Sequence, residues 1–170
     1  PAMTETPLFG VVSKEVLAEA IAQMPTVPSH VFLQAGVGGL AGACAALIRD
    51  VWGDAPRIIV VEPDVAPALH GSVAAGCPVE SSGPVSEMGR LDCKMPSLIA
   101  LKGLARDATE FMTISEADGH DGARAVSDAG LTSTPSGAAG VAGLMVAARS
   151  GGYELSNTSR VLVILSEGPE

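Results

Sequence analysis

The stretch that decides the fold is "HVFLQAGVGGLAGA", residues 30–43, in which an apolar run leads through clustered glycines into an alanine-rich segment. This order predicts a buried strand, a tight turn and a helix. Glycines at the carboxyl end of a strand let the backbone turn sharply and let a ligand approach, while the next helix offers unpaired N–H groups and the positive end of its dipole. Such a turn suits phosphate. Glycine clusters also serve packing alone, so both interpretations stay open at this point.

Strand-like and helix-like segments alternate along the rest of the chain. Three apolar runs resemble the first one and predict strands buried on both faces: residues 57–62, 110–115 and 160–165. Helical spacing is found in five segments: residues 38–52, 64–75, 97–105, 116–129 and 137–149. The order predicts an α/β fold, a mainly parallel open sheet with helices on both faces and a ligand site at the carboxyl ends of the strands.

Residue types at the ends of these segments predict where the helices begin and end. Three serines occupy expected N-cap positions, Ser97, Ser115 and Ser136. Gly130 and Gly151 are expected to end helices. Before the sheet, a helix beginning after Ser13 is expected to end near Pro25, so residues 1–27 form an N-terminal helix and linker and residues 28–170 the α/β domain. Residues 76–96 are rich in Gly, Pro and Ser and predict a long functional loop.

Composition excludes several classes of protein. The formal net charge is −9 and the ten Lys and Arg are scattered, which excludes nucleic acid as a partner. No apolar run reaches the roughly 18 residues of a membrane span, so we expect no membrane partner and a cytoplasmic location. The three cysteines, Cys44, Cys77 and Cys93, have no C-x-x-C spacing, which predicts reduced thiols rather than a disulfide framework or a zinc site.

Five segments in order carry a resemblance: "HVFLQAGVGGLAGA", "RIIVVEP", "LDCKMPSLIALKGL", "TPSGAAGVAGL" and "VLVILSEG". Together they are similar to the C-terminal half of the diaminopropionate ammonia-lyases, members of the tryptophan-synthase-β-like, fold-type II group of pyridoxal-phosphate (PLP) enzymes. The resemblance covers about residues 28–168. It implies β-elimination of 2,3-diaminopropionate to pyruvate and ammonia, with PLP as cofactor, a small amino acid as substrate and a homodimer in the full-length enzyme.

The resemblance also implies roles for particular residues. The turn holds the PLP phosphate through five residues: Gly36, Val37, Gly38, Gly39 and Leu40. Ser166 of "SEG" faces the pyridine nitrogen, where a neutral hydroxyl leaves that nitrogen unprotonated. Ser136 and Gly137 align with a segment near the cofactor, although a helix N-cap explains Ser136 equally well.

The lysine that such enzymes need for a Schiff base is not recognisable in this chain. Lys14 and Lys102 are expected on solvated helix faces, and Lys94 in the long loop is the one lysine with a conceivable local role. In the family, the Schiff-base lysine and the residues that bind the substrate carboxylate lie in the N-terminal half. The catalytic base therefore stays unknown, and we expect these 170 residues to be a fragment or truncated relative with no activity alone.

The sequence predicts no metal site. Some dehydratase relatives bind a cation through the Glu of "EP", but Ala68 stands where the second carboxylate would be, so Glu62 is expected to be a solvent-exposed residue at the end of a strand. His30, His70 and His120 do not cluster in the sequence. The acidic segment around His120, residues 116–121, is explained by a capping box from Ser115 to Asp118.

Other functions remain open beside the lyase. The chain could be a non-catalytic phosphate- or nucleotide-binding α/β module. The turn has neither the spacing G-x-G-x-x-G nor the Lys-Ser/Thr of a P-loop, so nucleotide is the less favoured anion. It could belong to another PLP dehydratase, such as a threonine or serine dehydratase. It could also be an inert fragment that self-associates through exposed apolar surface.

Overall fold

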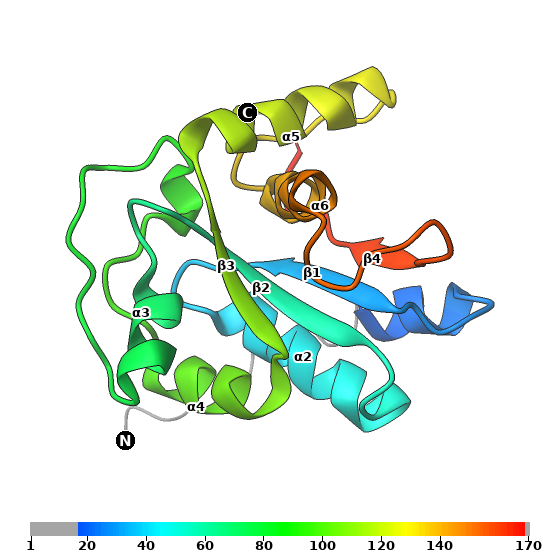
Figure 1. The fold of residues 1–170 in the computed structure, drawn as a ribbon, viewed down its shortest axis with the longest axis horizontal. Helices are drawn as coiled ribbons and strands as arrows, with labels where there is room; N and C mark the ends of the chain where they lie inside the picture. The colour runs from blue at the N-terminus through cyan, green and yellow to red at the C-terminus, as the bar shows by residue number, and fades with distance from the viewer. Residues whose placement is uncertain (1–16, 169–170) are drawn as a thin grey trace.

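A computed structural model describes residues 17–168 of the chain. Within them one sheet of parallel strands runs in the order β3-β2-β1-β4. The strands are β1 (His30–Gln34), β2 (Arg57–Pro63), β3 (Glu110–Ile114) and β4 (Val161–Val163). Each lies inside or within one residue of an apolar run of the sequence, which confirms the predicted parallel α/β fold (Figure 1).

The helices cover the sheet on both faces (Figure 1). One face carries α2 (Gly39–Trp52), α3 (Ala68–Ala75) and α4 (Leu98–Asp107). The other carries α6 (Ala139–Ser150), which packs on β1, β2 and β3, and α5 (Glu116–Asp128), which packs on α6. Residues 17–23 are also helical, whereas Ser13, the expected N-cap of that helix, lies outside the described residues. The long loop between α3 and α4 holds one short 3₁₀ turn, Gly89–Leu91.

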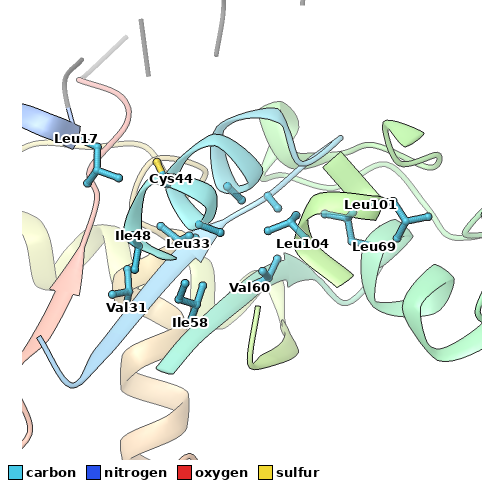
Figure 2. Close-up of a cluster of buried hydrophobic side chains, with 13 residues drawn as sticks. Leu17, Val31, Leu33, Cys44, Ile48, Ile58, Val60, Leu69, Leu101 and Leu104 are labelled. Atoms are coloured by element: carbon cyan, nitrogen blue, oxygen red, sulfur yellow. The ribbon is translucent and has the colours of Figure 1, made fainter. Parts of the chain in front are cut away.

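Both faces of the central strands are buried, which explains why their sequences are apolar without alternation. In β1, Val31 and Leu33 point into a core shared with α2 and α4 (Figure 2). Phe32 points to the opposite face, where it packs with Ile59 and Val61 of β2. All five side chains are at most 1% exposed. The short strand β4 is only half-buried.

Small residues let α6 lie close to the sheet. A Cβ atom on Gly143 would be 2.7 Å from Cγ2 of Val61, so a larger residue would push the helix away. The next layer is equally close, because a Cβ on Gly122 of α5 would be 2.8 Å from Cβ of Ala142. A chain that is 3% aromatic thus fills its core by bringing backbones together rather than with large rings.

Two of the three predicted N-caps are confirmed. The Ser97 hydroxyl accepts from the Ala100 N–H, and Ser115 forms the predicted capping box with Asp118. The prediction for Ser136 is wrong, because α6 begins at Ala139 with Ala138 at its N-cap and no side-chain cap. Ser136 lies instead in a turn that precedes α6, in which the Ala138 N–H binds the carbonyl of Thr134. The Ser136 hydroxyl instead accepts from the backbone N–H of Arg90.

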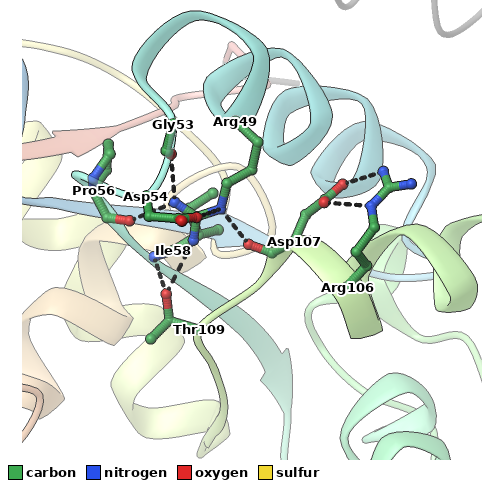
Figure 3. A network of polar contacts seen from close by, with 8 residues as sticks. All are labelled: Arg49, Gly53, Asp54, Pro56, Ile58, Arg106, Asp107 and Thr109. Atoms are coloured by element: carbon green, nitrogen blue, oxygen red, sulfur yellow. Dashed lines mark hydrogen bonds and ion pairs between the residues drawn. The ribbon is translucent and has the colours of Figure 1, made fainter.

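Arg49 of α2 joins the helix to the two loops that precede β2 and β3, at the amino ends of these strands (Figure 3). Its Nε donates to the carbonyl of Asp107 at 2.9 Å, and its terminal nitrogens donate to the carbonyls of Gly53 and Pro56 and to the Thr109 hydroxyl. The side chain is 18% exposed, so these bonds satisfy a largely buried guanidinium. This network fixes the loops that lead into β2 and β3, at the opposite end of the sheet from the carboxyl ends of the strands.

The strand order has one reversal that matters for function. From β1 the chain proceeds to β2 and then to β3 on one side, whereas β4 pairs with the other side of β1. Connections leaving β1 therefore run over one face and those arriving at β4 come from the other. In open parallel sheets, ligands bind beyond the carboxyl ends of the strands at such a reversal.

Candidate functional site

The glycine-rich turn connects β1 to α2 at this reversal. Gly38 is the N-cap of α2 and has a φ of 94°, a left-handed conformation that favours glycine. It is also buried, and a Cβ there would be 3.0 Å from side-chain atoms of both Ala100 and Leu69. Gly39 differs, since apart from its chain neighbours and the backbone of α2 itself no described atom lies within 4 Å of the position of a Cβ. The turn is thus packed on one side and open on the other.

The N-terminus of α2 is not satisfied by side chains. Among the described residues none caps it, and its first turn contains no acidic residue. The N–H of Gly42 makes the first helical hydrogen bond, to the carbonyl of Gly38, so the amides of residues 39–41 precede the helical ladder. By contrast α5 begins with a serine cap and two acidic residues, Glu116 and Asp118. The positive end of the α2 dipole faces the open side of the turn, as an anion would require.

The long loop returns to pack against the start of this turn. A Cβ on Gly36 would lie 2.9 Å from Sγ of Cys93 and 3.0 Å from the carbonyl oxygen of Arg90, so only glycine fits. The Ser97 N–H also binds the carbonyl of Val37 at 3.0 Å. Burial raises the pKa of the Cys93 thiol, against a smaller lowering by a hydrogen bond from the Val37 backbone. Cys93 is therefore a packing residue of the site and not an activated thiol.

Ser166 lies at the same edge of the sheet, in the segment that follows β4. Its Oγ accepts a hydrogen bond of 2.9 Å from Nε2 of Gln34, the last residue of β1. Gln34 is 3% exposed, and its Nε2 also donates to the carbonyls of Ile164 and Gly137 at 2.8 and 3.2 Å. One buried amide thus joins the strand before the glycine turn to the segment of Ser166 and to the turn before α6.

Sequence reasoning did not single out Gln34. The available signal was a lone amide at the end of an apolar strand, since a buried polar group needs partners. Sequence alone gives no hint that those partners lie more than 100 residues further along the chain.

Glu167 anchors the residue next to Ser166. Its carboxylate accepts from the Thr134 hydroxyl at 2.6 Å and pairs with Nε of Arg90 at 3.2 Å. Its backbone carbonyl accepts from the Ser133 hydroxyl at 2.9 Å. These contacts bring three segments together beside Ser166: the end of the chain, the turn before α6 and the 3₁₀ turn of the long loop. Ser136 and Gly137, both buried, belong to this assembly.

Neither described lysine is placed as a reactive amine at the turn. Nζ of Lys94 donates to the carbonyls of Val65 and Pro84, at 3.0 and 2.8 Å, and pairs with Asp92 at 2.6 Å. Lys94 thereby ties the long loop to the segment after β2. Lys102 is exposed on α4, and Lys14 lies outside the described residues.

The expectation of an exposed Glu62 is wrong. Its side chain is 0% exposed, and its two carboxylate oxygens accept the N–H groups of Leu69 and His70 at 2.8 and 2.7 Å, in the first turn of α3. Burial raises its pKa to about 7, against the two backbone hydrogen bonds, which lower it. Since "EP" ends a strand buried on both faces, the carboxylate has no path to solvent and satisfies the next helix instead.

The acidic segment around His120 is divided among separate partners. Glu116 accepts from the Ser86 hydroxyl at 2.6 Å, Asp118 pairs with Arg149, and His120 pairs with Glu87 of the long loop. Within residues 17–168 no group of three or more His, Cys, Asp or Glu side chains is arranged to hold a metal ion. None of the helices in that range is both long and apolar enough to cross a membrane.

An open parallel α/β sheet with a glycine turn and an uncapped helix at its strand-order reversal defines a class of ligand-binding domains. Residues 3–167 match the family described as "Pyridoxal-phosphate dependent enzyme", and the chain belongs to this family. The family resemblance inferred from the sequence is thereby confirmed.

Individual relatives agree. Diaminopropionate ammonia-lyase of Escherichia coli (strain K12) is 32% identical over 130 residues, which cover 72% of this chain and 33% of that protein. The structure of the Escherichia coli diaminopropionate ammonia lyase in complex with a PLP reaction intermediate superposes with a TM-score of 0.78, at 28% identity. It covers 94% of this chain and 44% of that one. Threonine deaminase isoform 2 from Solanum lycopersicum has a TM-score of 0.84 at 19% identity, over 93% of this chain and 45% of that one, which shows the shared fold alone. The chain thus spans a third to a half of the length of these relatives.

Proposed function

We propose that this chain is the C-terminal part of the PLP-binding domain of a diaminopropionate ammonia-lyase, an enzyme that releases ammonia and pyruvate from 2,3-diaminopropionate or a similar small amino acid. The observation that carries the proposal is the joint position of the glycine turn and Ser166, which one side chain, Gln34, holds at the same edge of the sheet. The substrate class rests on the 32% identity to the lyase, since the threonine deaminase supports the fold only.

The residues present fit the two ends of PLP. The backbone amides of the turn from Gly36 to Leu40, with the dipole of α2, hold the phosphate, apart from the Val37 amide, which binds the Cys93 thiol. The open space at Gly39 leaves room for it, and no carboxylate in the first turn of α2 repels it. Ser166 has an exposed side chain and donates its hydroxyl hydrogen to the ring nitrogen. When bound, PLP supplies an electron sink for bonds at the α-carbon of an amino acid.

In this proposal the chain contributes cofactor binding and not the Schiff-base amine, so it is inactive alone. Of the two lysines within residues 17–168, Lys94 is engaged by three oxygen atoms and Lys102 is exposed on α4. The full-length enzyme is a homodimer in the cytoplasm. In support of a reducing compartment, Cys44, Cys77 and Cys93 are all free thiols.

Substitutions at Gly39 test the phosphate cradle without disturbing the fold. Gly39→Asp places a carboxylate in the first turn of α2, where it is favourable for the helix but repels a bound anion. Gly39→Ala is the matched neutral control, because the position has room for a Cβ. Affinities for inorganic phosphate and for PLP are measured by calorimetry on the purified chain. We expect Gly39→Asp to lower both affinities at least tenfold and Gly39→Ala to change them less than threefold.

Intact mass after PLP and borohydride treatment completes the test. No pyridoxyl adduct is expected on a chain that provides only the cradle. A stoichiometric adduct on one lysine would contradict the proposed inactivity, and the modified residue would identify the amine. If ATP or NAD competes for the turn more strongly than PLP, the chain is a nucleotide-binding module and not part of a lyase.

A further inference from the structure

We infer that Gln34 is a positioning residue that makes Ser166 a hydrogen-bond donor toward its ligand, and so selects a ligand whose facing atom is an acceptor. The inference rests on the proposed function and adds to it the residue that fixes the direction in which Ser166 donates. Gln34 itself is buried behind Ser166 and acts through it.

The orientation of the Gln34 amide follows from its neighbours. Two of the three atoms around Nε2 are carbonyl oxygens, those of Ile164 at 2.8 Å and Gly137 at 3.2 Å, and carbonyls can only accept. If the amide were rotated by 180°, Oε1 would face both carbonyls and three acceptors would repel one another. The amide nitrogen must therefore face this side, with its two hydrogens shared among three acceptors, of which Oγ of Ser166 at 2.9 Å is the third.

This orientation has a visible cost. Oε1 of Gln34 is buried without a hydrogen-bond partner among the described residues, on the side where Gly140 approaches. An orphaned buried acceptor is uncommon, because it loses its bond to water without a replacement. Nε2 meanwhile donates to oxygen atoms of Ile164, Gly137 and Ser166. The hydrogen bonds of the nitrogen therefore determine the orientation of the amide, at the expense of the oxygen.

The consequence for Ser166 is a fixed polarity. A hydroxyl has one hydrogen and two lone pairs, and here one lone pair is occupied by Gln34. The hydrogen is then left to point toward the exposed side, where a ligand is reached. A donor hydroxyl matches an unprotonated ring nitrogen and opposes a protonated one, which would need an acceptor. Gln34 thereby sets which protonation state of a pyridine ring the site favours.

Glu167 keeps Ser166 in reach of Gln34. Its backbone and side chain are held by Ser133, Thr134 and Arg90. With residue 164 bound to Gln34 through its carbonyl and residue 167 bound to these three, the intervening chain has little freedom to move.

The test compares PLP with an analogue in which a C–H group replaces the ring nitrogen. Affinities are measured on four forms of the chain: unmodified, S166A, Q34M and the double variant. Methionine has a similar shape to glutamine and cannot donate. The unmodified chain should bind PLP about fivefold more tightly than the analogue, the size of one neutral hydrogen bond. S166A and Q34M should each bring this ratio close to one, and the double variant should do no more than S166A alone.

The ratio separates positioning from general structural damage. If Gln34 only supports the fold, Q34M weakens both probes equally and the ratio stays near five, which overturns the inference. Equal binding of PLP and analogue by the unmodified chain also overturns it, while phosphate binding at the turn would leave the cradle intact. Failure of the unmodified chain to bind both phosphate and PLP would instead remove the proposed function and the inference with it.

A measurement on the unmodified chain covers the case in which Q34M does not fold. The side-chain amide of Gln34 is observed by ¹⁵N NMR before and after addition of each probe, and again in S166A. We expect its signal to shift in S166A and on addition of PLP, and to shift less on addition of the analogue. A signal that ignores the Ser166 substitution would refute the coupling between the two side chains.

Discussion

The carboxylate of Glu62 accepts the backbone N–H of His70 at 2.7 Å, and so caps a helix from inside the protein. A buried acid in this position has opposing demands. The helix N-terminus and its N–H groups favour the charged form, whereas loss of water disfavours it. Desolvation is the larger effect here and raises the pKa of Glu62 to about 7.

This pKa predicts a pH dependence of stability. Because the folded-state pKa of about 7 is above the ordinary 4.5, the folded protein binds more protons than the unfolded chain between these values. The contribution of Glu62 to the free energy of unfolding therefore falls as pH rises from about 4.5 to 7, by up to about 3 kcal/mol. Urea unfolding across this range should show a smaller decline in Glu62→Gln. Glu80→Gln, at an exposed position, should keep the original slope, and an unchanged slope in Glu62→Gln would refute the assignment.

Gly38→Ala should destabilise the protein by about 1–3 kcal/mol, because it adds a Cβ at a φ of 94° and against tightly packed side chains. Gly39→Ala in the next position should be neutral or slightly stabilising, as glycine is a poor helix former. Urea unfolding midpoints provide the comparison. Equal effects at the two positions would show that the turn is not held as described.

Lys94→Met should loosen the long loop. The substitution leaves the carbonyls of Val65 and Pro84 and the carboxylate of Asp92 without their cationic donor, and about 1–3 kcal/mol of local stability is lost. Limited proteolysis should then cut within residues 76–96 before the rest of the domain. Lys102→Met, at an exposed position on α4, serves as the control and should leave the cleavage pattern unchanged. If the loop of Lys94→Met resists proteolysis as well as the loop of the unmodified chain, the loop is held by other contacts.

Arg49→Lys should fail to replace the native residue. A lysine has a single nitrogen and cannot reach four oxygen acceptors arranged around a planar guanidinium. We expect a loss of about 2 kcal/mol or more in unfolding free energy, since the part-buried carbonyls of Pro56 and Asp107 lose their donors. Arg106→Lys, at a side chain that is 73% exposed, should cost less than about 1 kcal/mol. Thermal unfolding of the two variants side by side distinguishes these outcomes.

Sequence reasoning succeeded where the signal is local. Apolar runs without alternation predict strands buried on both faces, and β1 and β2 are such strands. The capping box at Ser115 and the N-cap at Ser97 were predicted because a cap involves residues three positions apart. The glycine turn is equally local, and Gly38 has the positive φ that favours glycine.

It failed where the partner of a polar group is distant. Ser136 looked like a helix cap, but its hydroxyl binds the N–H of Arg90, which lies 46 residues earlier. Glu62 is expected to be exposed because acidic residues at strand ends usually are. In the structure it is buried, and its carboxylate accepts hydrogen bonds from two amides of the next helix. In both cases the sequence pattern indicated that the side chain binds backbone N–H groups or water near its own position, whereas the structure shows a different partner.

The sequence by itself determined the class of fold, the family and the position of the glycine turn, because these depend on periodicity and on short motifs. Only the tertiary structure decided how Ser166 meets that turn. The reversal of strand order places β4 beside β1, and Gln34 then spans the two segments across 132 residues of chain. Such a contact depends on which strands pair. Strand pairing is determined by the burial of both faces of the sheet, which involves residues far apart in the chain, so no local pattern encodes it.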